Sequence, residues 1–123
     1  MKLLTQALRN QLPPLYSQEN KGGKAMVWMK CFLPASKWRW YITEASSEGE
    51  DVIFFGLVDG FEKELGYFTL SELKGLRGPL GLRVERDLYW RPQPLEEVAP
   101  ELFAEQDETS HTEQNPVQRE EGR

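Results

Sequence analysis

Four runs with strand-like composition follow one another between residues 25 and 70, and some of the connections between them are very short. The runs are "AMVWMKCFL" (25–33), "KWRWYITEA" (37–45), "DVIFFGLVD" (51–59) and "KELGYFTL" (63–70). Only "PAS" separates the first pair and only "GFE" separates the last pair. Links this short join antiparallel neighbours, because a parallel crossover needs about a dozen residues or more. The pattern predicts a four-stranded antiparallel meander.

A short helix is expected on each side of the meander. Residues 3–12 have leucines near helical spacing, with Thr5 as the expected N-cap and a Pro-Pro pair after them. Residues 70–77 start with Ser71 as the expected N-cap and are followed by a Gly-Pro stop. Together with the strands, these helices predict an α+β fold.

The chain after the second helix is harder to assign. Residues 79–90 are expected to form a loop and then a short strand or an irregular segment, anchored by Val84, Leu88 and Tyr89. If this segment pairs, the antiparallel sheet has five strands; otherwise it has four. A last helical turn is expected at 94–98.

Charge and composition divide the chain into a domain (1–98) and a tail (99–123). Residues 1–100 hold 13 acids and 13 bases, whereas residues 101–123 hold seven acids and two arginines, which gives the whole net charge of -5. The tail has almost no large apolar residue and is expected to be disordered, because it has little to bury. A neutral domain lacks the strong basic character typical of nucleic-acid binding.

The chain is expected to be cytoplasmic. Its single cysteine, Cys31, has no internal disulfide partner, which is typical of a reducing compartment. No apolar run reaches the roughly 18 to 20 residues needed to cross a bilayer, so no membrane association is expected.

The stretch "KWRWYITEA" mixes cations with aromatic rings, which is typical of a surface that stacks single-stranded nucleic acid. Alternation along a strand separates the two types, since Trp38, Trp40 and Ile42 share one side while Arg39 and Tyr41 share the other. The tryptophans are therefore expected in the core.

One binding surface can be built from the remaining residues. Trp28, Lys30, Arg39 and Tyr41 are expected on one sheet face, which is either open to a partner or covered by residues 79–98. A second cationic region contains Arg77, Arg83 and Arg86.

Catalytic candidates are few. The only histidine, His111, lies in the predicted tail, and no cysteine and histidine cluster with zinc-ligand spacing exists. Asp59, Glu62 and Glu44 are the best remaining acids, because paired carboxylates hold Mg²⁺ or act as acid and base. Asp59 and Glu62 are explained more simply as part of a charged hairpin turn, which we favour over the catalytic interpretation. We therefore expect no resident metal or cofactor.

The ordered blocks "LPPLY", "FFGLVDGFEKELGYFTLSEL" and "RGPLGLRVERDLYW" resemble the bacterial domain-of-unknown-function family numbered 2958 over about residues 3–98. The resemblance implies no activity and no catalytic residues. It implies a setting, because members are often encoded on plasmids and other mobile elements beside DNA-processing genes.

Three functions remain open. The first is a non-enzymatic accessory protein of a mobile genetic element that binds a protein partner or nucleic acid. The second is a small metal-dependent hydrolase that uses Asp59, Glu62 and Glu44. The third is an inhibitor whose acidic tail mimics nucleic acid. The protein is expected to be a monomer or a weak homodimer, since an exposed sheet edge permits pairing.

Overall fold

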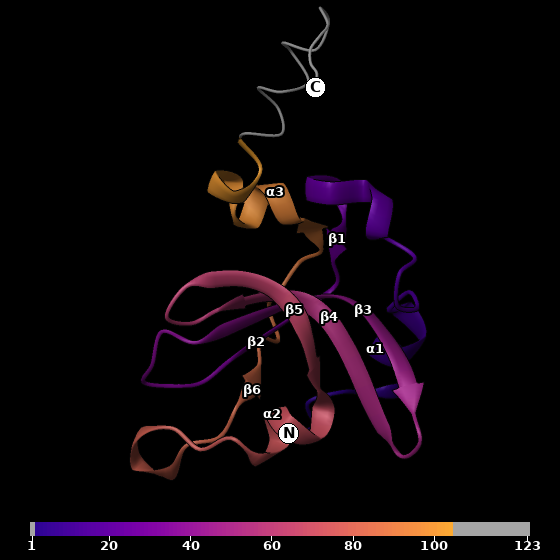
Figure 1. Cartoon of the computed structure of the whole chain (residues 1–123). Helices are drawn as coiled ribbons and strands as arrows, with labels where there is room; N and C mark the ends of the chain where they lie inside the picture. Colours follow the sequence, from indigo (N-terminus) through magenta and orange to yellow (C-terminus); the bar gives the residue numbers. More distant parts are fainter. Residues whose placement is uncertain (1, 105–123) are drawn as a thin grey trace, which may run out of the picture.

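A five-stranded antiparallel sheet with the order β5–β4–β3–β2–β6 forms the centre of the protein (Figure 1). The structure is a computed structural model, and it describes residues 2–104. The strands are β2 (Met29–Phe32), β3 (Arg39–Glu48), β4 (Asp51–Asp59), β5 (Lys63–Thr69) and β6 (Glu85–Arg86). Strands β2 to β5 are the predicted meander, and β6 is the fifth strand. The α+β fold class is confirmed.

Short elements flank this sheet. A second, two-stranded sheet pairs β1 (Met26–Val27) with β7 (Gln93–Pro94). The helical elements are α1 (Gln6–Gln11), α2 (Leu70–Gly75), α3 (Leu95–Val98) and the 3₁₀ turns η1 (Glu19–Lys24), η2 (Pro79–Gly81) and η3 (Pro100–Leu102). Within residues 2–104, no helix is long and apolar enough to cross a membrane.

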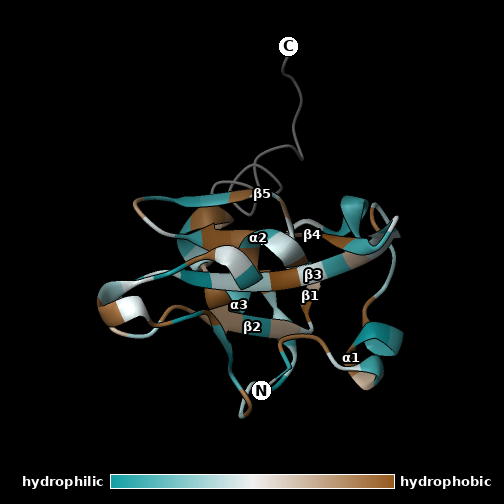
Figure 2. Cartoon of the chain, turned by 90° about the horizontal axis from the view of Figure 1, so that it is seen from below, coloured by the Kyte–Doolittle hydropathy of each residue, from teal (hydrophilic) through white to brown (hydrophobic). Residues whose placement is uncertain are grey.

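The lower face of the sheet, defined by Trp40, Ile42 and Phe54, carries the larger core. Leu73 of α2 and Leu12 after α1 are buried against it, and Figure 2 shows this side from below with α2 in front of β3 and β4. The predicted split of "KWRWYITEA" is confirmed here, because Trp40 and Ile42 belong to this core while Tyr41 does not.

The upper face, defined by Tyr41 and Leu57, carries a second and smaller core. Elements from both ends of the described chain cover it, as Figure 1 shows for η1, β1 and α3. Its buried members are Ala25, Val27, Leu57, Leu95, Ala99 and Phe103. A sheet that is apolar on both sides needs cover on both sides. Here each face of the sheet is covered by a core of its own.

Two predicted caps have different outcomes. Thr5 is the N-cap of α1, and its side chain accepts a hydrogen bond from the Leu8 N–H. The prediction of Ser71 for α2 is wrong, because Thr69 is the N-cap and forms a reciprocal capping box with Glu72. The Ser71 hydroxyl instead donates to Asp51 at 2.6 Å.

The folded chain extends past the boundary that we expected near residue 98. Residues 100–102 form η3, and Phe103 is buried in the upper core. Leu88 and Tyr89, expected as anchors, are exposed, and Trp90 packs in their place. Residues 105–123, including His111 and most of the acidic tail, lie outside the described residues.

Candidate functional site

A β-bulge in β3 turns one acidic side chain from the lower face to the upper face. Ile42 pairs with Gly56 and Glu44 pairs with Phe55, so Thr43 is an extra residue in the pairing. In an unbroken strand Glu44 would lie on the same side as Ile42, inside the main core. Bulges occur often beside functional sites, where they redirect a side chain in this way.

The bulge depends on a glycine in the neighbouring strand. A Cβ atom on Gly56 would lie 2.0 Å from the carbonyl oxygen of Tyr41, which is far closer than real contacts allow. The backbones of β3 and β4 can therefore approach at this point only because position 56 has no side chain.

The Glu44 carboxylate is buried, and two backbone groups fix it in place. The residue is 3% exposed, and its Oε1 and Oε2 accept hydrogen bonds from the N–H groups of Tyr16 (2.8 Å) and Gln18 (2.7 Å). Hydrogen bonds to a charged acceptor are stronger than neutral ones. They hold Tyr16 in the left-handed region with φ of 74°, a strained conformation that clusters at functional sites.

Gln18 links the same loop to the strands. Its side-chain amide donates to the carbonyls of Thr43 (2.8 Å) and Met26 (3.1 Å), and its oxygen accepts from the Met26 N–H (2.7 Å). The side chain is itself buried, so the bulge, the loop and β1 form one fixed polar unit.

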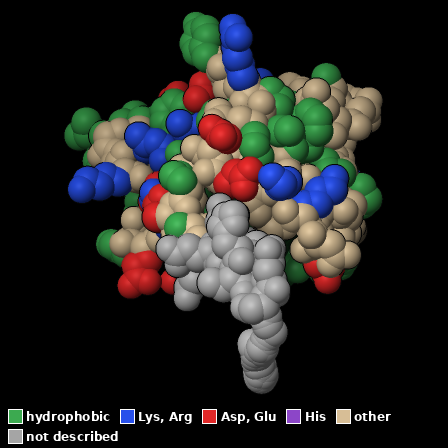
Figure 3. Space-filling model, turned by 90° about the horizontal axis from the view of Figure 1, so that it is seen from above, with side chains coloured by type: hydrophobic (Ala, Val, Ile, Leu, Met, Phe, Trp, Pro, Cys, Tyr) green, Lys and Arg blue, Asp and Glu red, His purple; other side chains and the backbone are tan. Residues whose placement is uncertain are grey.

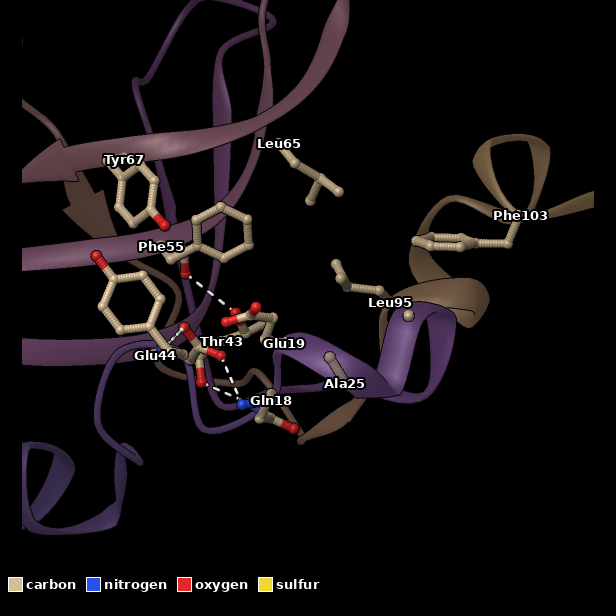
Figure 4. Close-up of a pocket in the computed structure, with 12 residues that line it drawn as sticks. Gln18, Glu19, Ala25, Thr43, Glu44, Phe55, Leu65, Tyr67, Leu95 and Phe103 are labelled. Carbon is tan, nitrogen blue, oxygen red and sulfur yellow. Dashed lines mark hydrogen bonds between the residues drawn. The ribbon is translucent and has the colours of Figure 1, made fainter. Parts of the chain in front are cut away.

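This polar unit forms the floor of a cavity of about 330 Å³ on the upper face. Figure 4 shows Tyr67, Phe55 and Leu65 on one side of it and Leu95 and Phe103 on the other. The lining residues come from the N-terminal loop and η1, from the three strands β3 to β5, and from the C-terminal segment. They are Tyr16, Gln18, Glu19, Gly22, Ala25, Thr43, Glu44, Phe55, Leu65, Tyr67, Leu95 and Phe103.

Aromatic rings form one wall of the cavity and remain accessible. The ring centroids of Phe55 and Tyr67 are 4.9 Å apart, and those of Tyr16 and Tyr67 are 6.4 Å apart. Tyr16 is 62% exposed and Tyr67 is 57% exposed. Loss of hydration raises the pKa of Tyr67, and Tyr16 together with the negative charges of Glu44 and Glu19 raises it further.

The predicted aromatic binding face lies elsewhere and is covered. The Lys30 ammonium lies over the rings of Tyr41 (5.5 Å) and Trp90 (5.7 Å) and forms an ion pair with Asp87 at 3.8 Å. The Trp90 indole donates to the Val27 carbonyl at 3.0 Å, which fixes the ring against Tyr41. We expected this face to be either open to a partner or covered by residues 79–98. The structure shows that it is covered, since Trp90 of that segment packs on Tyr41.

The two remaining members of that face, Trp28 and Arg39, differ from each other in position. The indole of Trp28 packs against the lower core, because the chain breaks between β1 and β2, although Trp28 still lines one hollow together with Lys30 and Trp90. Arg39 does lie on the upper face, with its guanidinium 5.7 Å from the Phe32 ring. It also donates to the carbonyls of Ser36 and Trp38.

The arginines of the second cationic region make separate backbone contacts. Arg77 donates to the carbonyls of Lys74 and Leu76, and a backbone bridge pairs Arg77 with Arg83. Arg86 lies in β6 and donates to the carbonyls of Lys2 and Leu3. Two of the three guanidinium groups thus donate to backbone carbonyls, Arg77 to those of residues beside it and Arg86 to those of the N-terminal segment.

Glu44 lies apart from the other two candidate acids. Asp59 lies four residues beyond Phe55 on β4, so about 13 Å of strand separates it from the position opposite Glu44. Glu62 is exposed in the turn after β4. In residues 2–104 no group of three or more His, Cys, Asp or Glu side chains is arranged to hold a metal ion. Only Glu44 belongs to the cavity.

Residues 3–111 match the model described as "Protein of unknown function (DUF2958)". The chain belongs to this family. The DUF2958 match spans every residue that lines the cavity. No curated protein and no solved structure matches the chain.

The sequence alone does not indicate most of the residues that line the cavity of this DUF2958 protein. Glu44 was a candidate, but its partners Tyr16 and Gln18 and the ring of Tyr67 were not. One signal was present, since a glycine inside a strand, here Gly56, often marks a bulge or a close backbone approach.

Proposed function

We propose that this DUF2958 protein is a non-enzymatic binding module that takes up a segment of a partner protein in the upper-face cavity. The family resemblance supplies the setting, an accessory protein of a mobile genetic element in the bacterial cytoplasm. The cavity is the observation that carries the proposal. Its floor is a fixed polar unit, whereas its rim exposes the apolar side chains of Leu65 and Tyr67.

The cavity has the dimensions and composition of a recognition site. Its volume is near the lower end of the range for ligand pockets, about 300–1,000 Å³, so it fits one or two side chains of a partner. A mostly apolar lining with a few fixed polar groups is the usual composition of such pockets. Pre-organised sites of this kind bind well because little ordering is left to do on binding.

Nucleic acid is a weaker candidate for the partner. Stacking needs open rings beside free cations, but Tyr41 packs under Trp90, and Lys30 is paired with Asp87. Seen from above, the surface has acidic and basic side chains interspersed and no continuous basic stripe (Figure 3). The metal-dependent hydrolase is weaker too, because about 13 Å of strand separates Asp59 from the position opposite Glu44.

A comparison of three baits tests the proposal. The full-length chain, immobilised and exposed to extract from a host that carries the parent element, is compared with Leu65→Ser/Tyr67→Ala. The matched control is Leu88→Ser/Tyr89→Ala, which makes the same two changes at exposed positions outside this cavity.

A partner should be retained by the unchanged chain and by the control, and lost from the cavity variant. All three baits should melt at similar temperatures, since the altered side chains are exposed. Equal retention on the cavity variant and the control would show that the cavity is not the binding site.

A further inference from the structure

The cavity has a one-sided charge. Its lining includes two carboxylates, Glu19 and Glu44, and no lysine, arginine or histidine. Two cations of neighbouring elements are paired with other acids, Lys24 with Glu96 and Lys63 with Glu101, and Lys21 of η1 lines a different hollow. A cavity with low-dielectric walls and one sign of charge concentrates ions of the opposite sign.

Glu44 has no cationic partner among residues 2–104, although it is almost fully buried. Buried carboxylates are normally paired with a cation, because burial of an isolated charge is costly. Each Glu44 oxygen accepts one backbone N–H, and an ionised carboxylate has about four acceptor positions in total. Acceptor capacity therefore remains for a donor that enters the cavity.

The aromatic wall of the cavity also favours a positively charged group. The faces of Tyr16, Phe55 and Tyr67 carry partial negative charge, which attracts an ammonium or guanidinium group. The protein already uses this chemistry once, because the Lys30 ammonium lies 5.5 Å from the Tyr41 ring and 5.7 Å from the Trp90 ring. There the arrangement is internal, whereas the rings of Tyr16 and Tyr67 face solvent.

Other occupants fit this site less well. A hard metal ion such as Ca²⁺ takes roughly 6–8 oxygen ligands. The lining offers only two carboxylates, which is too few to favour such an ion. Phe103 lines the cavity, and residues 105–123, which follow it in the sequence, contain six acids and two arginines. Like charge disfavours that segment as the occupant, and it disfavours phosphate groups in the same way.

We propose that the cavity accepts a lysine or arginine side chain of the partner polypeptide. This inference rests on the proposed function and specifies its ligand. The charged group lies at Glu44 and Glu19, within reach of the aromatic wall. Leu65, Leu95 and Phe103 line the rest of the cavity (Figure 4). The aliphatic stem packs on them, as long cationic side chains do on apolar surfaces.

Capped pentapeptides test the proposal. The ¹⁵N-labelled full-length chain is titrated with Ac-Ala-Ala-X-Ala-Ala-NH₂, in which X is lysine, arginine, norleucine or glutamate, and backbone amide shifts are followed by NMR. Norleucine is the matched control, because it keeps an apolar stem like that of lysine and lacks the ammonium. Lysine and arginine peptides should move the amides of Tyr16, Gln18 and Tyr67, with an affinity about tenfold above that of norleucine. The glutamate peptide should leave them unmoved.

A charge variant and a free amine complete the experiment. Glu19→Gln removes an exposed charge with little change of shape, and it should weaken the lysine peptide severalfold while leaving norleucine unaffected. n-Butylammonium should bind more weakly than the lysine peptide. If it binds equally well, the site recognises a free amine and the assignment to a polypeptide is wrong.

The outcomes separate this proposal from the preceding one. Equal binding of lysine and norleucine peptides, unmoved cavity amides with every peptide, or an unaffected Glu19→Gln variant would each overturn the cation assignment. The bait comparison is independent of these results. Partner loss from the Leu65→Ser/Tyr67→Ala bait would then still support the cavity as the binding site.

Discussion

The backbone N–H of Tyr16 donates a 2.8 Å hydrogen bond to the Glu44 carboxylate, 28 residues away in the sequence. This contact joins the loop before η1 to the bulge of β3. It holds the Tyr16 backbone in the left-handed region while the tyrosine ring remains exposed at the cavity. One buried carboxylate thus shapes the cavity and supplies part of its charge.

Replacement of Glu44 by alanine should lower the stability of the protein. The N–H groups of Tyr16 and Gln18 would lose their acceptor, and each buried donor left without one costs about 1–3 kcal/mol. Urea unfolding measures the difference. Glu48→Ala is the matched control, because Glu48 is exposed on the same strand and should change stability by less than about 0.5 kcal/mol. Equal effects of the two variants would show that the Glu44 contacts contribute nothing.

Two glycines that pair directly across β4 and β5 should respond in opposite ways. A Cβ at position 56 would clash with the Tyr41 carbonyl, whereas a Cβ at position 66 meets nothing within 4 Å. Gly56→Ala should therefore lower the melting temperature clearly. Gly66→Ala should preserve or raise it, because glycine in a strand costs about 0.5–1 kcal/mol relative to alanine. A tolerated Gly56→Ala would mean that the bulge does not need this close approach.

Periodicity predicted the strands, because alternation and short links are local properties of the sequence. It also predicted the two sides of residues 38–42, and the sheet uses both of them. Its limit was the bulge at Thr43, since one extra residue changes the side of every later side chain without changing composition. The predicted position of Trp28 on the upper face has a similar limit. The chain breaks beside it between β1 and β2, so the alternation does not continue through this residue.

The cavity was beyond sequence reasoning for a different reason. Tyr16, Glu44, Tyr67 and Phe103 come from four separate parts of the chain, and only the packed structure brings them together. The pattern of apolar residues on both faces did indicate that something must cover the upper face. It did not indicate that the cover would leave a hollow beside β5.

The Cys31 thiol should be unreactive in the folded protein. Burial raises its pKa from 9.0 to about 12. Thiol reagents at pH 8 should therefore label it only after unfolding. As the pH rises above 9, the unfolded thiol ionises while the folded thiol stays protonated, so the unfolded state binds fewer protons and stability falls. Over pH 9–12 the stability of Cys31→Ala should fall less than that of the unchanged chain. Parallel curves of unfolding free energy against pH for the two proteins would contradict the raised pKa of Cys31.

Tyr16→Gly should separate stability from binding. A non-glycine residue in the left-handed region costs about 1–2 kcal/mol, and glycine adopts that region freely, so the variant should be at least as stable as the unchanged chain. It should also bind the lysine pentapeptide more weakly, because one ring of the aromatic wall is lost. Ala35→Gly is the matched control, since Ala35 has φ of 61° and lies outside the cavity. That variant should show the same effect on urea unfolding and bind the peptide unchanged. If Tyr16→Gly were markedly less stable than Ala35→Gly, the ring would be needed for folding and its exposure would not indicate a binding role.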